Sequence, residues 1–215
     1  MIILGDGAVG KTSICKRFAD NEFSQQYKQT IGVDFFAKKM SLPPKTEATV
    51  QLWDIGGQSI GSKMLGNYIT GAHVVLLAYD VTNAESFMNL EDWLRVVITT
   101  FKDKELPLLA LIANKNDLRH MTAVRVEQHN AFAQENGMIS FLMSAKSGDQ
   151  VHSAFLKLTS NLCGVPLSQK ELEARVSTMV VPATIVDHVQ HDPNVSGGNM
   201  PQAKAKSTGM SCVVS

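Results

Sequence analysis

The 215-residue sequence lacks an excess of charge of either sign, because Lys and Arg together number 20, as do Asp and Glu. A balanced chain has no general electrostatic attraction to nucleic acid, so we expect no nucleic-acid partner. The sequence also lacks an apolar run near the roughly 18 residues that a membrane-spanning helix needs. Its apolar start of four residues is too short for a signal peptide. These absences favour a cytoplasmic protein.

Cysteine is scarce as well, since the chain has only Cys15, Cys163 and Cys212. Three scattered cysteines cannot build a disulfide framework, which suits a reducing compartment. Apolar residues are plentiful by contrast, and their share of 44% is enough for a sizeable core. At this length we expect one domain with some chain left over.

The segment Gly5–Thr12 reads G-D-G-A-V-G-K-T and fits the phosphate-loop pattern G-x-x-x-x-G-K-[ST]. An apolar run precedes it and a helix-like stretch follows, which is the context that the motif requires. Glycines let backbone N–H groups surround a phosphate, and the helix N-terminus adds positive charge. We expect Lys11 to reach the β- and γ-phosphates and the Thr12 hydroxyl to bind Mg²⁺. The expected phosphate-end residues are Gly5, Asp6, Gly7, Ala8, Val9, Gly10, Lys11, Thr12 and Ser13.

Strands and helices alternate along the rest of the chain. The expected strands cover residues 1–4, 30–42, 48–54, 74–79, 108–113 and 139–143. The second and third would pair as a hairpin. Thr82–Glu85 resembles a capping box, and the single helix behind it is expected to bury Ile98 with its other apolar residues. The pattern predicts an α/β fold with a mostly parallel six-stranded sheet, helices on both faces, and ligand loops at the carboxyl ends of the strands.

A second motif, D-I-G-G-Q, occupies Asp54–Gln58 at the end of the third strand. The Asp54 carboxylate suits a contact to Mg²⁺ through water. The Gly57 N–H would meet a γ-phosphate, and Gln58 can orient a water molecule. Such a Gly-rich turn is common by itself, but its position downstream of a phosphate loop favours the functional interpretation.

A third motif, N-K-x-D, occupies Asn114–Asp117 after a buried strand. A carboxylate accepts two parallel hydrogen bonds from the N1–H and amine of guanine, and adenine has no such pair, so Asp117 would select guanine. Asn114 can brace the loop and approach the purine edge, and the stem of Lys115 can lie along the ring. After the last strand come Ser144, Ala145 and Lys146, where the Ala145 N–H would contact the purine oxygen.

Together these motifs resemble the Ras superfamily of small GTPases over residues 1–164, a P-loop domain of the small G-protein type. Within this superfamily, the Rab branch is the one to which three segments are similar: Ile31–Phe35, Tyr68–His73 and Tyr79–Asn83. The resemblance implies a GTP/GDP switch that needs Mg²⁺, hydrolyses GTP slowly and regulates vesicle traffic. It matches Phe23 to the aromatic that flanks guanine. It implies catalytic roles for Lys11, Thr30, Gly57 and Gln58, and metal binding by Thr12, by Thr30 in the GTP form, and by Asp54 through water.

Two features depart from the Rab pattern. Most Rabs have Thr-Ala at Ile55–Gly56, where this chain leans toward the Arf pattern, and most end in two cysteines. A nucleotide-gated scaffold with negligible hydrolysis therefore remains an alternative. A phosphate-loop ATPase or kinase is a further alternative, which the guanine-selective Asp117 opposes.

Residues 165–215 predict a flexible tail, because Pro193–Ser211 is rich in Pro, Gly, Ser and Asn. The tail ends in Cys212–Ser215, a C-a-a-X pattern whose terminal Ser favours farnesyl on Cys212. One lipid holds a membrane only marginally, so we expect reversible attachment to the cytoplasmic face. A divergent Rab with a similar second motif points to the cilium base or endosomal membranes. Implied partners are effectors, an exchange factor, an activating protein and a prenyl-binding carrier, acting on a monomer.

Overall fold

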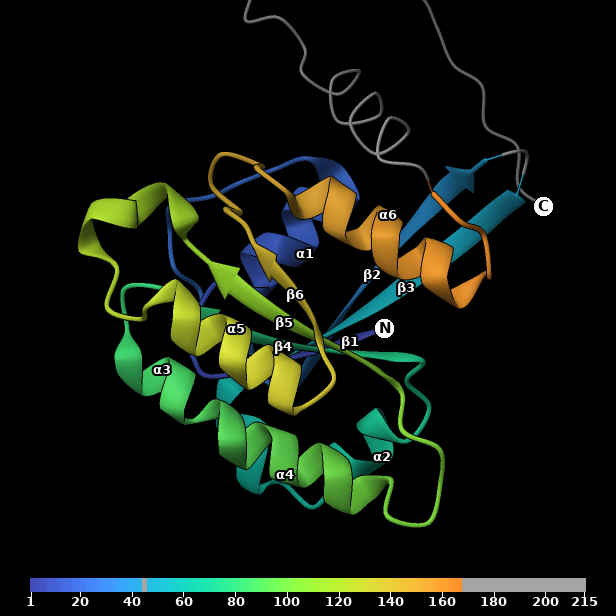
Figure 1. Ribbon diagram of the computed structural model, residues 1–215, viewed down its shortest axis with the longest axis horizontal. Coiled ribbons are helices and arrows are strands. Elements are labelled where there is room, and N and C mark those ends of the chain that lie inside the picture. Colours follow the sequence, from blue (N-terminus) through green and yellow to red (C-terminus); the bar gives the residue numbers. More distant parts are fainter. Residues whose placement is uncertain (44–45, 168–215) are drawn as a thin grey trace, which may run out of the picture. The chain divides into compact units, whose positions relative to one another are not determined.

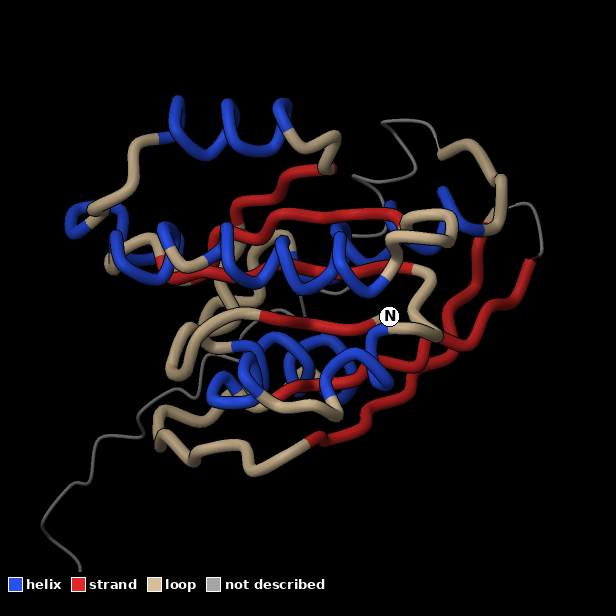
Figure 2. Tube along the Cα trace, turned by 90° about the horizontal axis from the view of Figure 1, so that it is seen from below, coloured by secondary structure: helices blue, strands red, loops and turns tan. Residues whose placement is uncertain are grey.

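The computed structural model describes residues 1–43 and 46–167, so the predicted tail lies outside the described residues from position 168 onward. The sheet consists of β1 (Ile2–Leu4), β2 (Val33–Leu42), β3 (Thr46–Ile55), β4 (Val74–Asp80), β5 (Leu108–Asn114) and β6 (Ile139–Leu142). The strand order is β2-β3-β1-β4-β5-β6. The β2–β3 hairpin is antiparallel and all other neighbours are parallel. The prediction of a mostly parallel six-stranded sheet is confirmed, and Figure 2 shows the strands side by side.

Helices cover both faces of this sheet, as predicted. They are α1 (Lys11–Asp20), α2 (Leu65–Ile69), α3 (Ala84–Met88), α4 (Leu90–Thr100), α5 (Val126–Glu135) and α6 (Val151–Leu162), with short 3-10 segments η1 (Gly57–Gly61) and η2 (Asn116–Met121). Figure 1 shows α1 and α6 over one face, and α2, α4 and α5 over the other.

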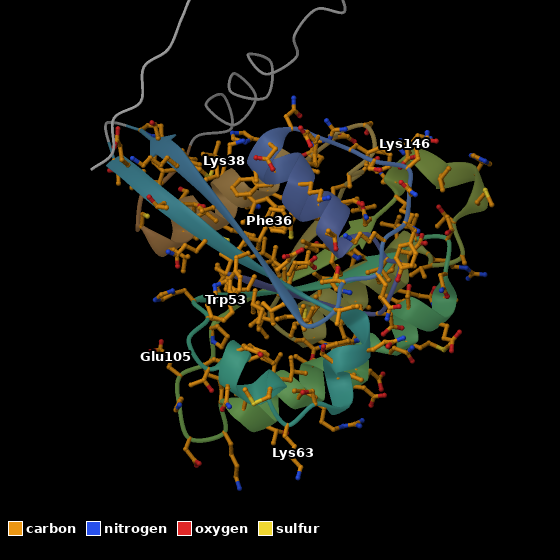
Figure 3. All side chains as sticks on the ribbon, turned by 180° about the vertical axis from the view of Figure 1, so that it is seen from behind. Phe36, Lys38, Trp53, Lys63, Glu105 and Lys146 are labelled. Carbon is orange, nitrogen blue, oxygen red and sulfur yellow. The ribbon has the colours of Figure 1, made fainter. Side chains whose placement is uncertain are left out.

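The alternation of side chains along the strands divides the core into two layers. Ile3 of β1 packs in the layer beneath α1 and α6, where the Phe18 and Phe155 rings stack with centroids 4.0 Å apart. Ile2 and Leu4 face the opposite layer. The same alternation continues in the β2–β3 hairpin (Figure 3), where Phe36 packs against the first layer and Trp53 against the second. The central strands β4 and β5 are therefore buried on both faces, which explains their continuous apolar runs.

Three local predictions are wrong. The cap of α3 is Asn83, whose side-chain oxygen accepts the N–H groups of Glu85 and Ser86, while Thr82 turns back to Asp80. The expected single helix is two helices that meet at Asn89. Ile98 is 49% exposed, because the buried face of α4 is centred on other residues and Ile98 falls at its edge. Those buried residues are Leu90, Trp93, Leu94 and Val97.

The parallel pairing places the carboxyl ends of β1, β3, β4 and β5 at one edge of the sheet. The chain leaves these strands at Gly5, Gly56, Val81 and Lys115. Ligand sites in open α/β sheets form at this edge. The three motifs are thereby brought together although they are far apart in the sequence.

Candidate nucleotide-binding site

A cavity of about 320 Å³ is formed by loops that follow β1, β3, β5 and β6, together with the segment before β2. This volume lies at the lower end of the range for small-molecule sites. The predicted residues that line it are Gly7, Ala8, Gly10, Lys11, Thr12, Ser13, Phe23, Thr30, Gly57, Gln58, Asn114, Lys115, Asp117, Ala145 and Lys146. Five other predicted residues are not among the lining residues, but each makes a hydrogen bond to one of them: Gly5, Asp6, Val9, Asp54 and Ser144.

The phosphate loop between β1 and α1 is closed by the side chain of Lys11. Its Nζ donates to the backbone oxygens of Gly5 and Asp6, each at 2.6 Å. Burial lowers the pKa of Lys11 to about 8, while the nearby Asp54 and Asp6 carboxylates oppose the shift. A buried ammonium in this position favours an anion that enters the loop, because the anion would offset its lost hydration.

Gly5 must be glycine for this loop to lie on the sheet. Its φ of 138° belongs to the region that L side chains rarely adopt. A Cβ on Gly5 would also lie 2.1 Å from the backbone oxygen of Ala78 in β4. The loop therefore rests directly on the neighbouring strand, with no room for a side chain between them.

Three oxygen-bearing side chains meet at the N-terminus of α1. The Thr12 hydroxyl donates to Asp54 Oδ2 at 2.5 Å and lies 2.8 Å from the Thr30 hydroxyl. The second carboxylate oxygen of Asp54, Oδ1, is buried and has no hydrogen-bond partner among the described residues. Burial raises the pKa of Asp54, and the Thr12 hydrogen bond and the Lys11 charge oppose that rise. A hard cation that keeps its water suits this cluster, since a coordinated water would satisfy Oδ1.

The Gly56–Gly57 pair joins the second motif to the phosphate loop. A Cβ on Gly57 would lie 2.2 Å from the Gly7 nitrogen, so Gly57 packs directly on the loop. The Gly56 N–H donates to the Gly32 carbonyl at 2.9 Å, which ties the segment before β2 to the end of β3. Gln58 follows on η1, where its side chain is exposed and lines the cavity.

Asn114 connects the base end of the cavity to the phosphate loop. Its amide nitrogen donates to the Val9 carbonyl at 2.8 Å, and its oxygen accepts the Ala145 N–H at 3.1 Å. The N–H predicted to meet a purine thus faces Asn114 in this structure. A Cβ on Gly10 would lie 2.4 Å from the Asn114 nitrogen, so glycine is required there too. The predicted bracing role of Asn114 agrees with this geometry.

Asp117 is oriented by the loop after β6. Ser144 Oγ donates to Asp117 Oδ1 at 2.6 Å, and Lys146 Nζ lies 3.8 Å from Oδ2. A carboxylate has about four acceptor positions, so these contacts leave positions for further donors. The carboxylate is thereby held ready to accept a pair of hydrogen bonds from a ligand at this end of the cavity.

Several residues that the sequence analysis did not single out complete the site. Asp80 at the end of β4 pairs with Lys115 at 2.6 Å. Tyr27 lines the cavity near Gly7, four residues after the predicted Phe23, in a polar segment without clear periodicity. Arg17 of α1 donates to the backbone oxygen of Ala145 after β6, 128 positions away. No local sequence pattern predicts such a contact.

The Asp6 carboxylate joins the phosphate loop to the start of α4. Asn89 Nδ2 donates to Asp6 Oδ2 at 2.6 Å, and Trp93 Nε1 donates to Oδ1 at 2.9 Å. Trp93 is fully buried, and its indole N–H makes this polar link. Both carboxylate oxygens are therefore satisfied away from the cavity.

The chain is similar to known proteins over most of its length. The family model of the Ras family matches residues 1–163. The chain is 45% identical to the Ras-related protein Rab-28 of Caenorhabditis elegans over 188 residues, which cover 87% of this chain and 75% of the relative. It is 33% identical to the Ras-related protein RABA1c of Arabidopsis thaliana over 183 residues, covering 85% and 83% of the two chains.

Proposed function

Because this chain belongs to the Ras family of small GTPases, we propose that it is a guanine-nucleotide switch of the Rab type that hydrolyses GTP slowly and regulates membrane traffic. One observation carries the proposal. A single cavity has the buried Lys11 ammonium and the Thr12–Thr30–Asp54 cluster at one end and the oriented Asp117 carboxylate at the other. A nucleoside polyphosphate has the charge and the donor groups that match these two ends.

At the phosphate end, Lys11 and the loop backbone would bind the β- and γ-phosphates. Thr12, Thr30 and, through water, Asp54 would hold Mg²⁺, which neutralises charge on the phosphates when bound. The orphan Asp54 Oδ1 supports this assignment, because it requires a donor that the described protein groups do not provide. Thr30 can leave this cluster when its own loop moves, so the cluster suits a site that senses the γ-phosphate.

For hydrolysis, Gln58 would orient a water molecule in line with the γ-phosphate, and the Gly57 N–H would hold a phosphate oxygen. No arginine is among the described residues that line the cavity. Unaided turnover should therefore be slow, and an activating protein would supply the missing charge. An exchange factor would be needed to release GDP.

Exposed apolar and aromatic groups that suit effectors lie on the switch segments, about 20–32 and 55–68, and on the β2–β3 hairpin between them. Ile31 is 91% exposed and Phe35 is 63% exposed. The Phe35 ring meets Trp53 edge-on at 4.8 Å, and Trp53 lies 6.2 Å from Tyr68. This surface spans both segments, so a change in either would alter what an effector meets.

For membrane attachment, we propose farnesylation of Cys212 and transport by a prenyl-binding carrier. Cys212 lies outside the described residues, so this proposal rests on the C-a-a-X pattern. Attachment would be peripheral, on the cytoplasmic face, with the cilium base and endosomal membranes as candidate locations.

The first test identifies the nucleotide that the purified protein carries. The chain is purified in Mg²⁺ buffer and denatured, and the released nucleotide is identified by ion-exchange chromatography. We expect GDP at nearly one per protein, because Asp117 accepts from the guanine amine and N1–H. Displacement of this nucleotide by ATP at equal concentration would contradict guanine selection and support an ATPase or kinase instead.

The second test addresses hydrolysis. Gln58→Leu removes the group that would orient water, so we expect single-turnover GTP hydrolysis to slow by about ten- to a hundredfold while GTP binding survives. Gln51→Leu is the matched control, because Gln51 is exposed on β3 away from the cavity. Equal hydrolysis by the Gln58 variant and the unmodified protein would contradict the assigned role.

A scaffold with negligible hydrolysis is the second candidate function, favoured by the unusual Ile55–Gly56 pair. Multiple-turnover hydrolysis with a cognate activating protein separates the two. Turnover would reject the scaffold, and tight GTP binding without turnover would support it.

A further inference from the structure

We propose that Arg17 is a positioning residue that holds the loop 144–146 against guanine and thereby determines how strongly the site recognises the purine O6. This inference rests on the guanine-nucleotide function proposed above. It adds a residue that lies outside the three sequence motifs and outside the cavity wall.

The guanidinium of Arg17 donates hydrogen bonds to two consecutive backbone carbonyls of this loop. Nε donates to the Ala145 oxygen at 2.9 Å and Nη2 donates to the Lys146 oxygen at 2.8 Å. The remaining Nη1 donates to the backbone oxygen of Asn21 at 2.7 Å and to its side-chain oxygen at 3.1 Å. A planar guanidinium presents these donors in a fixed fork, so it fixes the spacing and direction of its partner carbonyls.

The loop is thus held on two sides. Its inner side contacts the residues predicted for guanine, through the Ala145 N–H on Asn114 and the Ser144 hydroxyl on Asp117. Its outer side is bound by Arg17. Ala145 and Lys146 line the cavity, whereas Arg17 is not among the described lining residues. Arg17 therefore acts on a ligand through the loop and not by direct contact.

The same helix also serves the other end of the site. The first residues of α1, Lys11 and Thr12, belong to the phosphate end, and Arg17 lies in its last turn. A single rigid helix therefore sets the distance between the phosphate end and the base end. Loss of the Arg17 contacts would free the base end while leaving the phosphate end in place.

The experiment compares three nucleoside diphosphates whose bases differ at one group. GDP presents O6, N1–H and the exocyclic amine. The 6-thio analogue of GDP replaces O6 by sulfur, a weaker acceptor, and keeps the two donors that face Asp117. Inosine diphosphate keeps O6 and N1–H and lacks only the amine. The first analogue therefore tests the proposed contact of O6 with the Ala145 N–H, which O6 would share with, or take from, the Asn114 oxygen that accepts this N–H in the structure. The second analogue tests Asp117.

Dissociation constants are measured for the unmodified protein, Arg17→Met and Arg17→Lys. We expect the unmodified protein to prefer GDP over the 6-thio analogue by about fivefold, as one hydrogen bond allows. Both variants should bind GDP about tenfold more weakly and lose most of this preference. Their preference for GDP over inosine diphosphate should stay unchanged. Lysine keeps the charge without the fork, so similar behaviour of the two variants would exclude a simple charge effect.

Arg95→Met is the matched control. Arg95 is exposed on α4, and its ion pair is with Asp92 on the same helix. Each preference is the ratio of two dissociation constants measured on the same variant. A general loosening of the site that weakens the binding of both ligands equally therefore leaves this ratio unchanged. If Arg17→Met does not fold, Arg17→Lys gives the same ratios. GDP binding with an unchanged 6-thio preference in either folded variant, or no such preference in the unmodified protein, would overturn this inference alone. Failure of the unmodified protein to bind GDP would overturn the proposed function as well.

Discussion

At the scale of single residues, Gly56 determines how closely the two switch segments approach each other. It is buried between them, and a Cβ at this position would lie 2.5 Å from the Thr30 carbonyl oxygen. Most Rabs carry alanine there. The glycine of this chain therefore permits an approach that alanine would prevent, which gives a physical role to one of its two departures from the Rab pattern.

Gly56→Ala should push Thr30 away from Thr12 and Asp54. We expect affinity for GTP to fall by about tenfold relative to GDP at saturating Mg²⁺, which corresponds to about 1.4 kcal/mol, because Thr30 would serve only the triphosphate form. Competition between labelled GTP and GDP measures this ratio. Gly61→Ala is the control, since a Cβ on Gly61 would meet nothing within 4 Å. An equal loss for both nucleotides would show that the effect is not specific to Thr30.

At the scale of elements, α4 supports the phosphate loop. The start of this helix provides Asn89 and Trp93, which donate to the two oxygens of the Asp6 carboxylate. The backbone oxygen of the same residue receives the Lys11 ammonium. The loop is therefore clamped between a helix on one face of the sheet and a lysine from α1 on the other.

Trp93→Phe should weaken this clamp, because it leaves one Asp6 oxygen without its buried donor. We expect a loss of about 1–3 kcal/mol in the free energy of unfolding. We also expect faster release of a fluorescent GDP analogue. Trp53→Phe is the matched control. Trp53 is half-buried, and a phenylalanine in its place can still pack against Phe35 and Tyr68. If both variants lost the same stability and released nucleotide equally fast, the polar link would have no special role.

At the scale of the whole molecule, membrane attachment would depend on the tail. Among the described residues, no helix is both long enough and apolar enough to cross a bilayer. The C-a-a-X sequence at the end of the tail offers a lipid site that is separate in sequence from the nucleotide motifs. Attachment and nucleotide binding should therefore be separable by mutation.

Cys212→Ser should abolish farnesyl transfer and binding to phospholipid vesicles while GDP affinity stays unchanged. The unmodified, farnesylated protein should bind vesicles weakly and reversibly, because one lipid chain gives only marginal attachment. Cys163→Ser is the control, since Cys163 is an exposed cysteine outside the C-a-a-X pattern. Vesicle binding by the Cys212 variant would contradict the proposed lipid anchor.

The sequence by itself determined the fold class and the placement of the three motifs. The strands and helices were predictable because apolar periodicity is a local property, read over a few residues. The phosphate loop around Lys11, the turn at Gly57 and the loop at Asp117 were predictable because each motif is a short run with its own chemistry. The capping of α3 by Asn83 and the exposure of Ile98 were not predictable, because they depend on which neighbours the turn or the helix face contacts in the folded chain.

Only the tertiary structure decided how the motifs are held. Asp6 meets Trp93 across 87 positions of the chain, and Arg17 meets Ala145 across 128. The reason for a glycine at position 56 is visible only in the folded chain, where the Thr30 carbonyl lies against it. The physical reason is that hydrogen bonds and close packing depend on distances in space, and the sheet topology sets these distances between residues that are remote in the sequence.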